Sequence, residues 1–277
     1  MARKHGFFRP HVLGLTAISS TTMKEAGGYT FVNSEAAALA ARFTTPPTNS
    51  RKALIDTLVG SLKTAGVWSK LDAFYMLAAA DAQSSLLNWV STSYNLTAVS
   101  SPTFAADKGY TGNGTTSYLD TGFNPTTAPS PKFTQNSAHL GLWSRTNLPN
   151  GAADSQDAGS ANAYIGRSVA VAGRALGRPN ASSGQQFGDG AYPGHAVWAR
   201  SAAAVWESYA QGVDAGGGTT ASAAPTNSTL AILRSRDGNF GANQIASVHI
   251  GSNLTAGEVQ AAYNALNTYL TGVPGFF

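Results

Sequence analysis

The chain has 277 residues, of which only 12% are charged, and its formal net charge is +4 at neutral pH. A compact chain of this length buries roughly three quarters of its unfolded surface, so it can form a stable core without disulfides or structural metals. The absence of cysteine excludes disulfides, thiolate metal sites and cysteine nucleophiles. The cations form no continuous basic stripe, and no stretch is long and apolar enough to span a bilayer, so we expect neither nucleic-acid binding nor membrane insertion.

Residues 1–48 are expected to form an N-terminal anchoring arm that ends in a short helix. The arm begins with an aromatic and basic group, Arg3, Lys4, Phe7, Phe8 and Arg9. We interpret Phe7 and Phe8 as a docking peg that inserts into a partner, and the alternative is an ordinary frayed terminus. Ser34 is the expected cap of the helix, which runs to Arg42 through an alanine-rich stretch.

Residues 49–90 are expected to form a helical collar. Asn49 or Ser50 caps a first helix, and Gly66 ends it where a left-handed residue costs glycine little. Its apolar residues recur at helical spacing: Leu54, Ile55, Leu58, Val59 and Leu62. A second helix is expected from Trp68 towards Ala82. Stripes of this kind are typical of core packing and not of an active site.

Residues 91–277 change to short β-type runs separated by turns rich in Gly, Asn, Asp and Pro. The predicted strands are 95–99, 118–120, 139–145, 163–171, 195–200, 205–211, 230–234 and 245–250. This spacing predicts a mainly β, antiparallel sandwich. A helix closes the chain, with Thr255 as its N-cap and Glu258 at the capping-box position. Its apolar face holds Val259, Ala262, Tyr263, Leu266 and Leu270.

The end of the chain resembles a known fold family. The run Ser235–Phe240, the strand at 245–250 and the segment Leu254–Val259 are similar to the final strands and closing helix of concanavalin A-like and laminin G-like sandwiches. Glu207–Asp214 resembles the penultimate hairpin of that family. The resemblance covers about residues 95–272 and implies a lectin-like jelly-roll domain.

A second resemblance extends over more of the chain and is to virion structural proteins of bacteriophages and prophages, of the tail or fibre type. The segments that carry it are 54–58, 67–72, 88–89, 95–99, 101–104, 108–110 and 117–125. It implies a place in the virion, with other virion proteins and copies of the same chain as partners, so that the chain is an oligomer docked through its N-terminal region. The sandwich would then be displayed for host attachment. The alternative is a capsid decoration or neck protein with a purely cementing role.

We expect no catalysis. This argues against a third hypothesis, in which the chain is a glycan-degrading spike protein. Jelly-roll glycosidases need two carboxylates at a defined separation. Glu207 is the single glutamate on a predicted strand of the sandwich, and no histidine spacing typical of a zinc site occurs. We therefore expect no catalytic residue, no metal and no cofactor.

Aromatic and polar residues on three predicted strands form the candidate ligand site. They are His139, Trp143, Arg145, Trp198, Arg200, Glu207 and Tyr209. Alternation along a strand places the members of each strand on one face. If the three faces coincide, they form an aromatic platform with a polar rim, which suits a host-surface glycan. The alternative is that the Trp rings pack beneath loops, helices or a neighbouring subunit, as large aromatic residues usually do.

Overall fold

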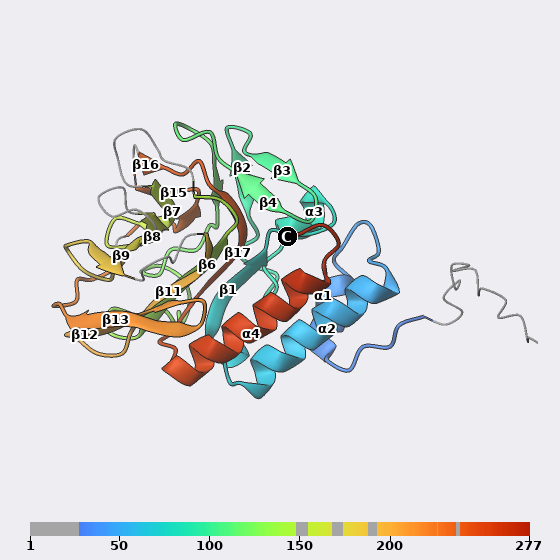
Figure 1. The fold of residues 1–277 in the computed structure, drawn as a ribbon, viewed down its shortest axis with the longest axis horizontal. Helices are drawn as coiled ribbons and strands as arrows, with labels where there is room; N and C mark the ends of the chain where they lie inside the picture. Colours follow the sequence, from blue (N-terminus) through green and yellow to red (C-terminus); the bar gives the residue numbers. More distant parts are fainter. Residues whose placement is uncertain (1–27, 148–154, 168–173, 188–192, 226, 237–238) are drawn as a thin grey trace, which may run out of the picture.

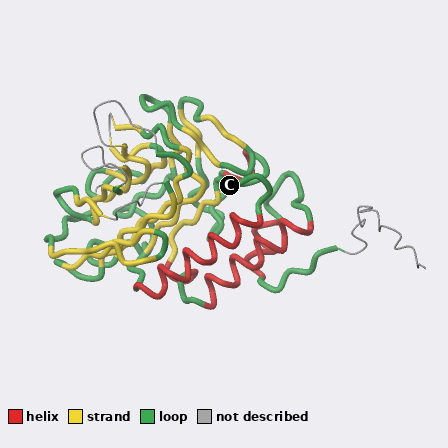
Figure 2. Tube along the Cα trace, in the orientation of Figure 1, coloured by secondary structure: helices red, strands yellow, loops and turns green. Residues whose placement is uncertain are grey.

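The computed structural model describes residues 28–147, 155–167, 174–187, 193–225, 227–236 and 239–277. Two antiparallel β-sheets pack face to face, and helices cover the outer face of one of them (Figure 1). The tube drawn in Figure 2 separates the helices from the body of strands. The described chain therefore has three layers: helices, a first sheet and a second sheet.

The first sheet, sheet A, has the strand order β13-β12-β11-β6-β17-β4-β3 within the described residues, and β1 also pairs with β17. Its strands are β1 (Leu71–Met76), β3 (Thr103–Ala105), β4 (Gly109–Thr111), β6 (Ala138–Ser144), β11 (Gly194–Arg200), β12 (Val205–Ala210), β13 (Val213–Thr219) and β17 (Gln244–Gly251). Segments far apart in the sequence are thus direct neighbours, because β17 lies between β1 and β6.

The second sheet, sheet B, has the order β10-β9-β8-β7-β14-β5-β2 among the described residues. Its strands are β2 (Thr97–Val99), β5 (Tyr118–Asp120), β7 (Ser155–Ser160), β8 (Ala163–Arg167), β9 (Ala175–Pro179), β10 (Gln185–Phe187) and β14 (Ala231–Ile232). A separate hairpin joins β15 (Arg234–Arg236) to β16 (Asn239–Phe240). The mainly β, antiparallel sandwich fold predicted from the sequence is confirmed.

The helices are α1 (Ser34–Ala40), α2 (Asn49–Thr64), α3 (Ala82–Ser85) and α4 (Ala256–Gly272), with a 3₁₀ turn at Trp68–Lys70. The predicted capping box of Thr255 and Glu258 is present at the start of α4. The predicted cap of α2 is wrong, since Thr48 and not Asn49 or Ser50 accepts the hydrogen bond from the Arg51 backbone. Gly66 ends α2 with φ at +75°, as expected.

Two apolar clusters, one on each face of sheet A, hold the layers together. Phe74 and Val197 pack on the helix side, beneath α2 and α4, which lie side by side in Figure 1. Leu140, Leu142 and Val248 pack between the two sheets. Burial on both faces explains why the central strands β6 and β11 contain no exposed residue.

The second helix predicted for the collar is wrong. After the 3₁₀ turn the chain enters β1, which pairs with β17 at the centre of the fold. Phe74 faces the helices and Tyr75 faces sheet B, so both side chains are buried. A strand that is apolar on both faces loses the alternation of a half-buried strand, and its short apolar run resembles a helix segment.

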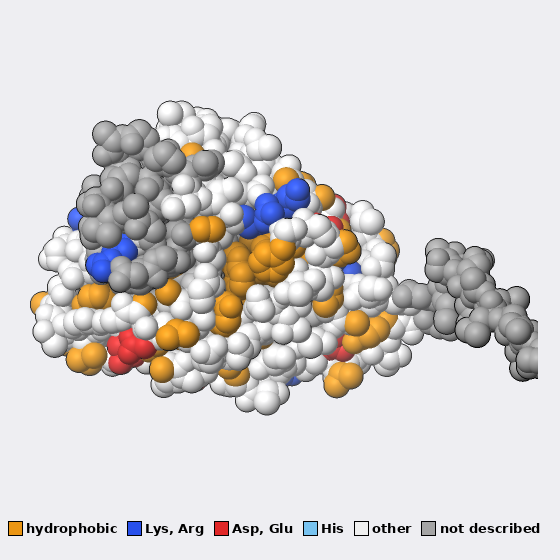
Figure 3. All heavy atoms as spheres, in the orientation of Figure 1, with side chains coloured by type: hydrophobic (Ala, Val, Ile, Leu, Met, Phe, Trp, Pro, Cys, Tyr) orange, Lys and Arg blue, Asp and Glu red, His pale blue; other side chains and the backbone are white. Residues whose placement is uncertain are grey.

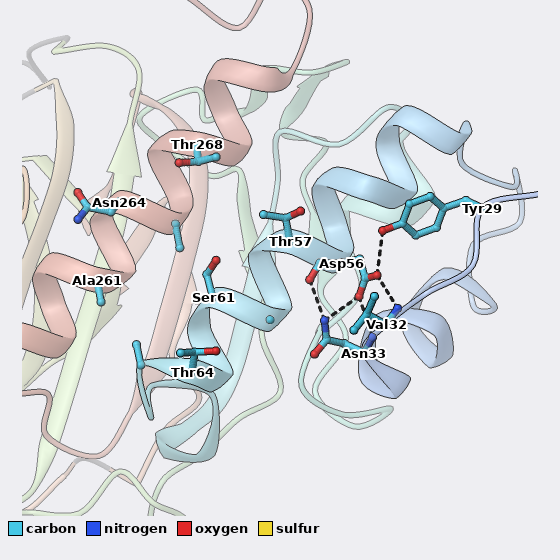
Figure 4. Close-up of a pocket in the computed structure, with 13 residues that line it drawn as sticks. Tyr29, Val32, Asn33, Asp56, Thr57, Ser61, Thr64, Ala261, Asn264 and Thr268 are labelled. Atoms are coloured by element: carbon cyan, nitrogen blue, oxygen red, sulfur yellow. Dashed lines mark hydrogen bonds between the residues drawn. The ribbon is translucent and has the colours of Figure 1, made fainter. Parts of the chain in front are cut away.

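The segment that enters the described structure is tied to α2 by one carboxylate. Asp56 is 2% exposed and accepts hydrogen bonds from the Tyr29 hydroxyl (2.9 Å), the Val32 backbone N–H (2.7 Å) and both the backbone and side-chain nitrogens of Asn33 (2.9 and 2.8 Å) (Figure 4). Although burial raises its pKa, these hydrogen bonds leave the pKa of Asp56 below its ordinary value. Residues 1–27, and with them Arg3, Lys4, Phe7, Phe8 and Arg9, lie outside the described residues.

Candidate functional site

The structure does not bring the seven predicted ligand-binding residues onto one exposed face. Trp198 is fully buried between the sheets, and its Nε1 donates to the Tyr164 carbonyl of sheet B at 2.9 Å. Arg200 is also fully buried, and it donates to carbonyl oxygens, among them that of Thr220 at 3.0 Å. Both side chains hold the two sheets together, so their predicted place on a platform is wrong.

The remaining members lie on the other face of sheet A or at its edge. His139 and Trp143 are buried under α4, while Tyr209 is buried and donates its hydroxyl to the exposed Glu207 carboxylate. Burial and the neighbouring Glu207 carboxylate raise the pKa of Tyr209, so this hydroxyl keeps its proton at neutral pH. Strand pairing explains the division, because Trp143 lies opposite His195 whereas Trp198 lies opposite Leu140.

A pocket of about 480 Å³ opens where the end of β6 meets α4 and the C-terminal residues. Its aromatic wall is built around Trp143, whose ring stacks on Tyr263 of α4 at 5.8 Å between centroids. Phe276 and Phe277 pack edge-on against the same indole at 6.4 and 6.5 Å. Phe277 is 77% exposed, and hydrophobic side chains gather near the marked C-terminus on the face drawn in Figure 3.

Polar groups complete the lining of this C-terminal pocket. Arg145 donates to the Phe276 carbonyl from Nε (3.1 Å) and Nη2 (2.5 Å), which fixes the last residues of the chain. Gln211 accepts from the His195 backbone N–H at 3.2 Å. Asn267 of α4 is half-buried, and its side-chain amide has no hydrogen-bond partner among the described residues. The pocket therefore offers the amide groups of Gln211 and Asn267 beside an aromatic wall, while the Arg145 guanidinium is already bound to the Phe276 carbonyl.

A row of three buried histidines lies beneath the aromatic wall, on β6, β17 and β11. Nε2 of His195 lies 3.0 Å from Nε2 of His249, and Nδ1 of His139 lies 2.5 Å from the Ser252 carbonyl. The His139 and His249 rings are 5.0 Å apart between centroids. Gly141 leaves the room for this row, because a Cβ there would meet the His249 ring at 2.1 Å. His195 also stacks on Tyr263, so the row connects with the C-terminal pocket.

The histidine row predicts loss of stability in acid. Burial lowers the pKa of His139 to about 4, although the hydrogen bond with the Ser252 carbonyl opposes this shift. Burial also lowers the pKa of His195 to about 3 and that of His249 well below its ordinary value. The unfolded chain, with histidine pKa near 6.5, then binds protons that the folded chain does not. The three histidines therefore cost no stability above about pH 6.5, and the free energy of unfolding falls as the pH drops towards 4. Urea midpoints measured from pH 7.5 to 4.5 check this.

The matched variant for the acid prediction is His249→Leu, which removes the central member of the row. Its urea midpoint should depend less on pH across the same interval, even if the variant is less stable at pH 7.5. An unchanged slope would contradict a contribution of His249 to the acid loss. Asp56, Glu35 and Glu258 are the carboxylates to expect in that case, because the pKa of each lies below its ordinary value and the stability that each contributes is lost as the pH falls.

A larger groove of about 650 Å³ runs between α2 and α4, on the outer side of the helical layer. Figure 4 shows Thr57, Ser61 and Thr64 of α2 across from residues of α4, and Asp56 on the side of α2 that faces Tyr29 and Asn33. Its walls are small side chains, and its carboxylate is engaged by the tether. The described residues contain no group of three or more His, Cys, Asp or Glu that could hold a metal ion. Their helices are too short or too polar to cross a membrane.

Comparison with known proteins shows the fold alone. No protein-family model and no curated protein sequence matches this chain. Sialidase from Trypanosoma rangeli, in complex with 2,3-difluoro-KDN, is similar at TM-score 0.52 and 11% identity, over 79% of this chain and 40% of the sialidase. Domain 4 of AbnA, a GH43 extracellular arabinanase from Geobacillus stearothermophilus, in complex with arabinotriose, has TM-score 0.46 and 15% identity, over 70% of this chain and 98% of that domain. The chain thus spans about two fifths of the sialidase's length.

These observations define the class of the protein as an antiparallel β-sandwich with a helical layer on one sheet. Its candidate site is the C-terminal pocket. Sequence reasoning found two of the residues that line this pocket, Trp143 and Arg145, but it missed Tyr263, Asn267 and the C-terminal phenylalanines.

Proposed function

We propose that this chain is a carbohydrate-binding virion protein and that the C-terminal pocket is its sugar site. The single observation that carries the sugar proposal is the pairing of an aromatic wall with an unpartnered amide, Trp143 and Tyr263 beside Asn267, in a surface pocket. Flat rings suit the apolar face of a sugar ring, and amides bond its hydroxyl groups. The volume of about 480 Å³ lies in the usual range for small-ligand sites.

The lining also bears on the reaction class. The described lining residues include no Asp or Glu, and Arg145 is held by the Phe276 carbonyl and the Gln244 side chain. A glycosidase needs a pair of acids at the scissile bond. This supports binding over hydrolysis at this pocket.

Binding of defined oligosaccharides tests the sugar site. We expect at least one of arabinotriose, maltotriose and sialyllactose, or a bacterial O-antigen oligosaccharide, to bind the full chain with Kd of about 1 mM or tighter, which is about −4 kcal/mol. Phe277→Ala, which removes an exposed ring, should weaken that binding about fivefold, since an aromatic contact contributes about 1 kcal/mol. Isothermal titration calorimetry measures both.

Two matched changes on α4 make the test specific. Asn267→Ala should weaken binding, while Asn264→Ala should not, because Asn264 lines the groove between α2 and α4 instead. Equal effects of the two substitutions, or no binding across the whole panel, would overturn the sugar site.

The location in a virion is supported by the sequence resemblance to phage tail- and fibre-type proteins, and host attachment is the role that a sugar site would give it there. The N-terminal arm would dock the chain to other virion proteins or to copies of itself. Deleting residues 1–12 should abolish incorporation into purified particles, measured by quantitative mass spectrometry. Normal incorporation of the deleted chain would overturn the anchoring role.

A further inference from the structure

A second, smaller pocket of about 190 Å³ lies at the other end of the helical layer, beside the start of α2. Its walls are mostly apolar and include Phe43, Pro46, Pro47, Trp89 and Tyr269. Trp89 packs edge-on against both Phe74 (5.2 Å) and Tyr269 (5.8 Å), so this wall is rigid. The volume is below the usual range for small-ligand sites, and it suits a single anchoring side chain.

One buried donor in this pocket lacks a partner. The Trp89 side chain lines the pocket and is 3% exposed, yet its Nε1 finds no acceptor among the described residues. A buried N–H without an acceptor costs about 1–3 kcal/mol, so buried indoles usually find one. The natural partner of such a group beside an apolar hole is the carbonyl of a peptide whose side chain fills the hole.

The path of the chain brings a suitable peptide to this place. The Tyr29 backbone N–H donates to Asn49 Oδ1 at 3.2 Å, and the neighbouring Thr48 lines the pocket. The chain thus enters the described structure next to the pocket's rim. Twenty residues separate Phe8 from Gly28, a span of up to about 65 Å, so the aromatic pair can reach the pocket of its own chain or of a neighbouring copy.

Charge also favours this segment. Asp81 lines the pocket and forms no ion pair among the described residues, whereas Arg51, which also lines it, is paired with the nearby Asp107 at 2.5 Å. The segment around Phe7 and Phe8 carries Arg3, Lys4 and Arg9. Opposite charges at the rim orient a docking peptide even where they add little affinity.

We propose that the pocket bounded by Pro46, Pro47 and Trp89 is the receptor for the Phe7–Phe8 segment of a neighbouring copy of this chain. One phenylalanine ring packs against the prolines and the indole, and a carbonyl of the segment accepts from Trp89 Nε1. The inference rests on the anchoring role proposed above for the arm and names the surface on which the arm docks.

Disulfide trapping in the full chain tests the docking directly, because the natural sequence contains no cysteine. Arg9→Cys is combined with Ala80→Cys, an exposed position that lines the pocket. Under mild oxidation with diamide the pair should cross-link at least about tenfold faster than Arg9→Cys combined with Val213→Cys, an exposed position on β13, because docking raises the effective concentration. Mass spectrometry then identifies the cross-link, which should join two chains; a cross-link within one chain would overturn docking between copies.

Adding Phe7→Ala and Phe8→Ala to the trapping pair should return its rate to that of the Val213→Cys control. Trapping that persists without the phenylalanines, or that is no faster than the control from the start, would overturn the pocket assignment. The anchoring role itself fails only if chains lacking residues 1–12 still enter particles. The two failures are therefore distinguishable.

Discussion

Trp198→Ala should lower the free energy of unfolding by about 4 kcal/mol, as truncation of a large core aromatic usually does. The ring is fully buried between the sheets, packs edge-on against Phe133 at 6.1 Å and donates to the Tyr164 carbonyl. The substitution leaves a cavity in the inter-sheet core and removes the hydrogen bond to the Tyr164 carbonyl of sheet B. Urea unfolding at pH 7.5 measures the loss.

Trp198→Phe is the matched variant, since it keeps most of the ring and removes the indole N–H. We expect it to cost about half as much as the alanine substitution, because burial of the ring outweighs one hydrogen bond. If Trp198→Ala instead left stability unchanged and reduced glycan binding, the assignment of this residue to the core would be contradicted.

Asp56→Ala should cost about 3 kcal/mol and release the segment that precedes α1. Its carboxylate accepts from Tyr29, Val32 and Asn33, and hydrogen bonds to a charged group are stronger than neutral ones. Near-surface N–H groups regain water when the acceptor is lost, so the cost is below the sum of the separate bonds. Hydrogen exchange at the Val32 and Asn33 amides, together with urea unfolding, checks both effects.

Asp56→Asn removes the negative charge of this side chain and keeps one of its two hydrogen-bond acceptor oxygens. The amide oxygen still accepts hydrogen bonds, so we expect a smaller loss of stability, and the contribution of this carboxylate to acid sensitivity should disappear. Slow exchange of the Val32 and Asn33 amides in Asp56→Ala would contradict the tether.

The sequence predicts those parts of the fold that depend on contacts between residues close together in the chain. The capping box at Thr255 and the end of α2 at Gly66 satisfy backbone groups within a few residues, so they are legible in one segment. The strands of sheet A next to β17 depend on distant partners. The sequence of β1 resembles that of a helix because helices cover one face of the strand and sheet B covers the other, so both faces are apolar.

The candidate site was only half predictable for a related reason. Alternation correctly placed Trp143 and Arg145 on one side of their strand, but it carries no information on which faces of different strands coincide. The sequence predicts Tyr263 as a member of the apolar face of the closing helix. The same Tyr263 ring also forms part of the wall of the pocket, which the helical pattern does not reveal. No local pattern in the sequence predicts a role for Phe277. Phe277 lies at the pocket because the Arg145 guanidinium binds the carbonyl of the preceding residue, Phe276.

The division into an arm at 1–48, a collar at 49–90 and a sandwich at 91–277 stays a prediction. Within the described residues, α2 packs against α4 and the 71–76 strand belongs to sheet A. The collar segment is thus built into the same core as the sandwich.

The side-chain amide spectrum of the full chain tests the central claim most directly. Isotope-labelled protein is titrated with the oligosaccharide that binds in calorimetry, and the Asn267 and Gln211 side-chain amides are followed by NMR. The account predicts that these resonances shift with the calorimetric Kd, while that of Asn264 stays in place. Saturable binding that leaves Asn267 and Gln211 unmoved would contradict it.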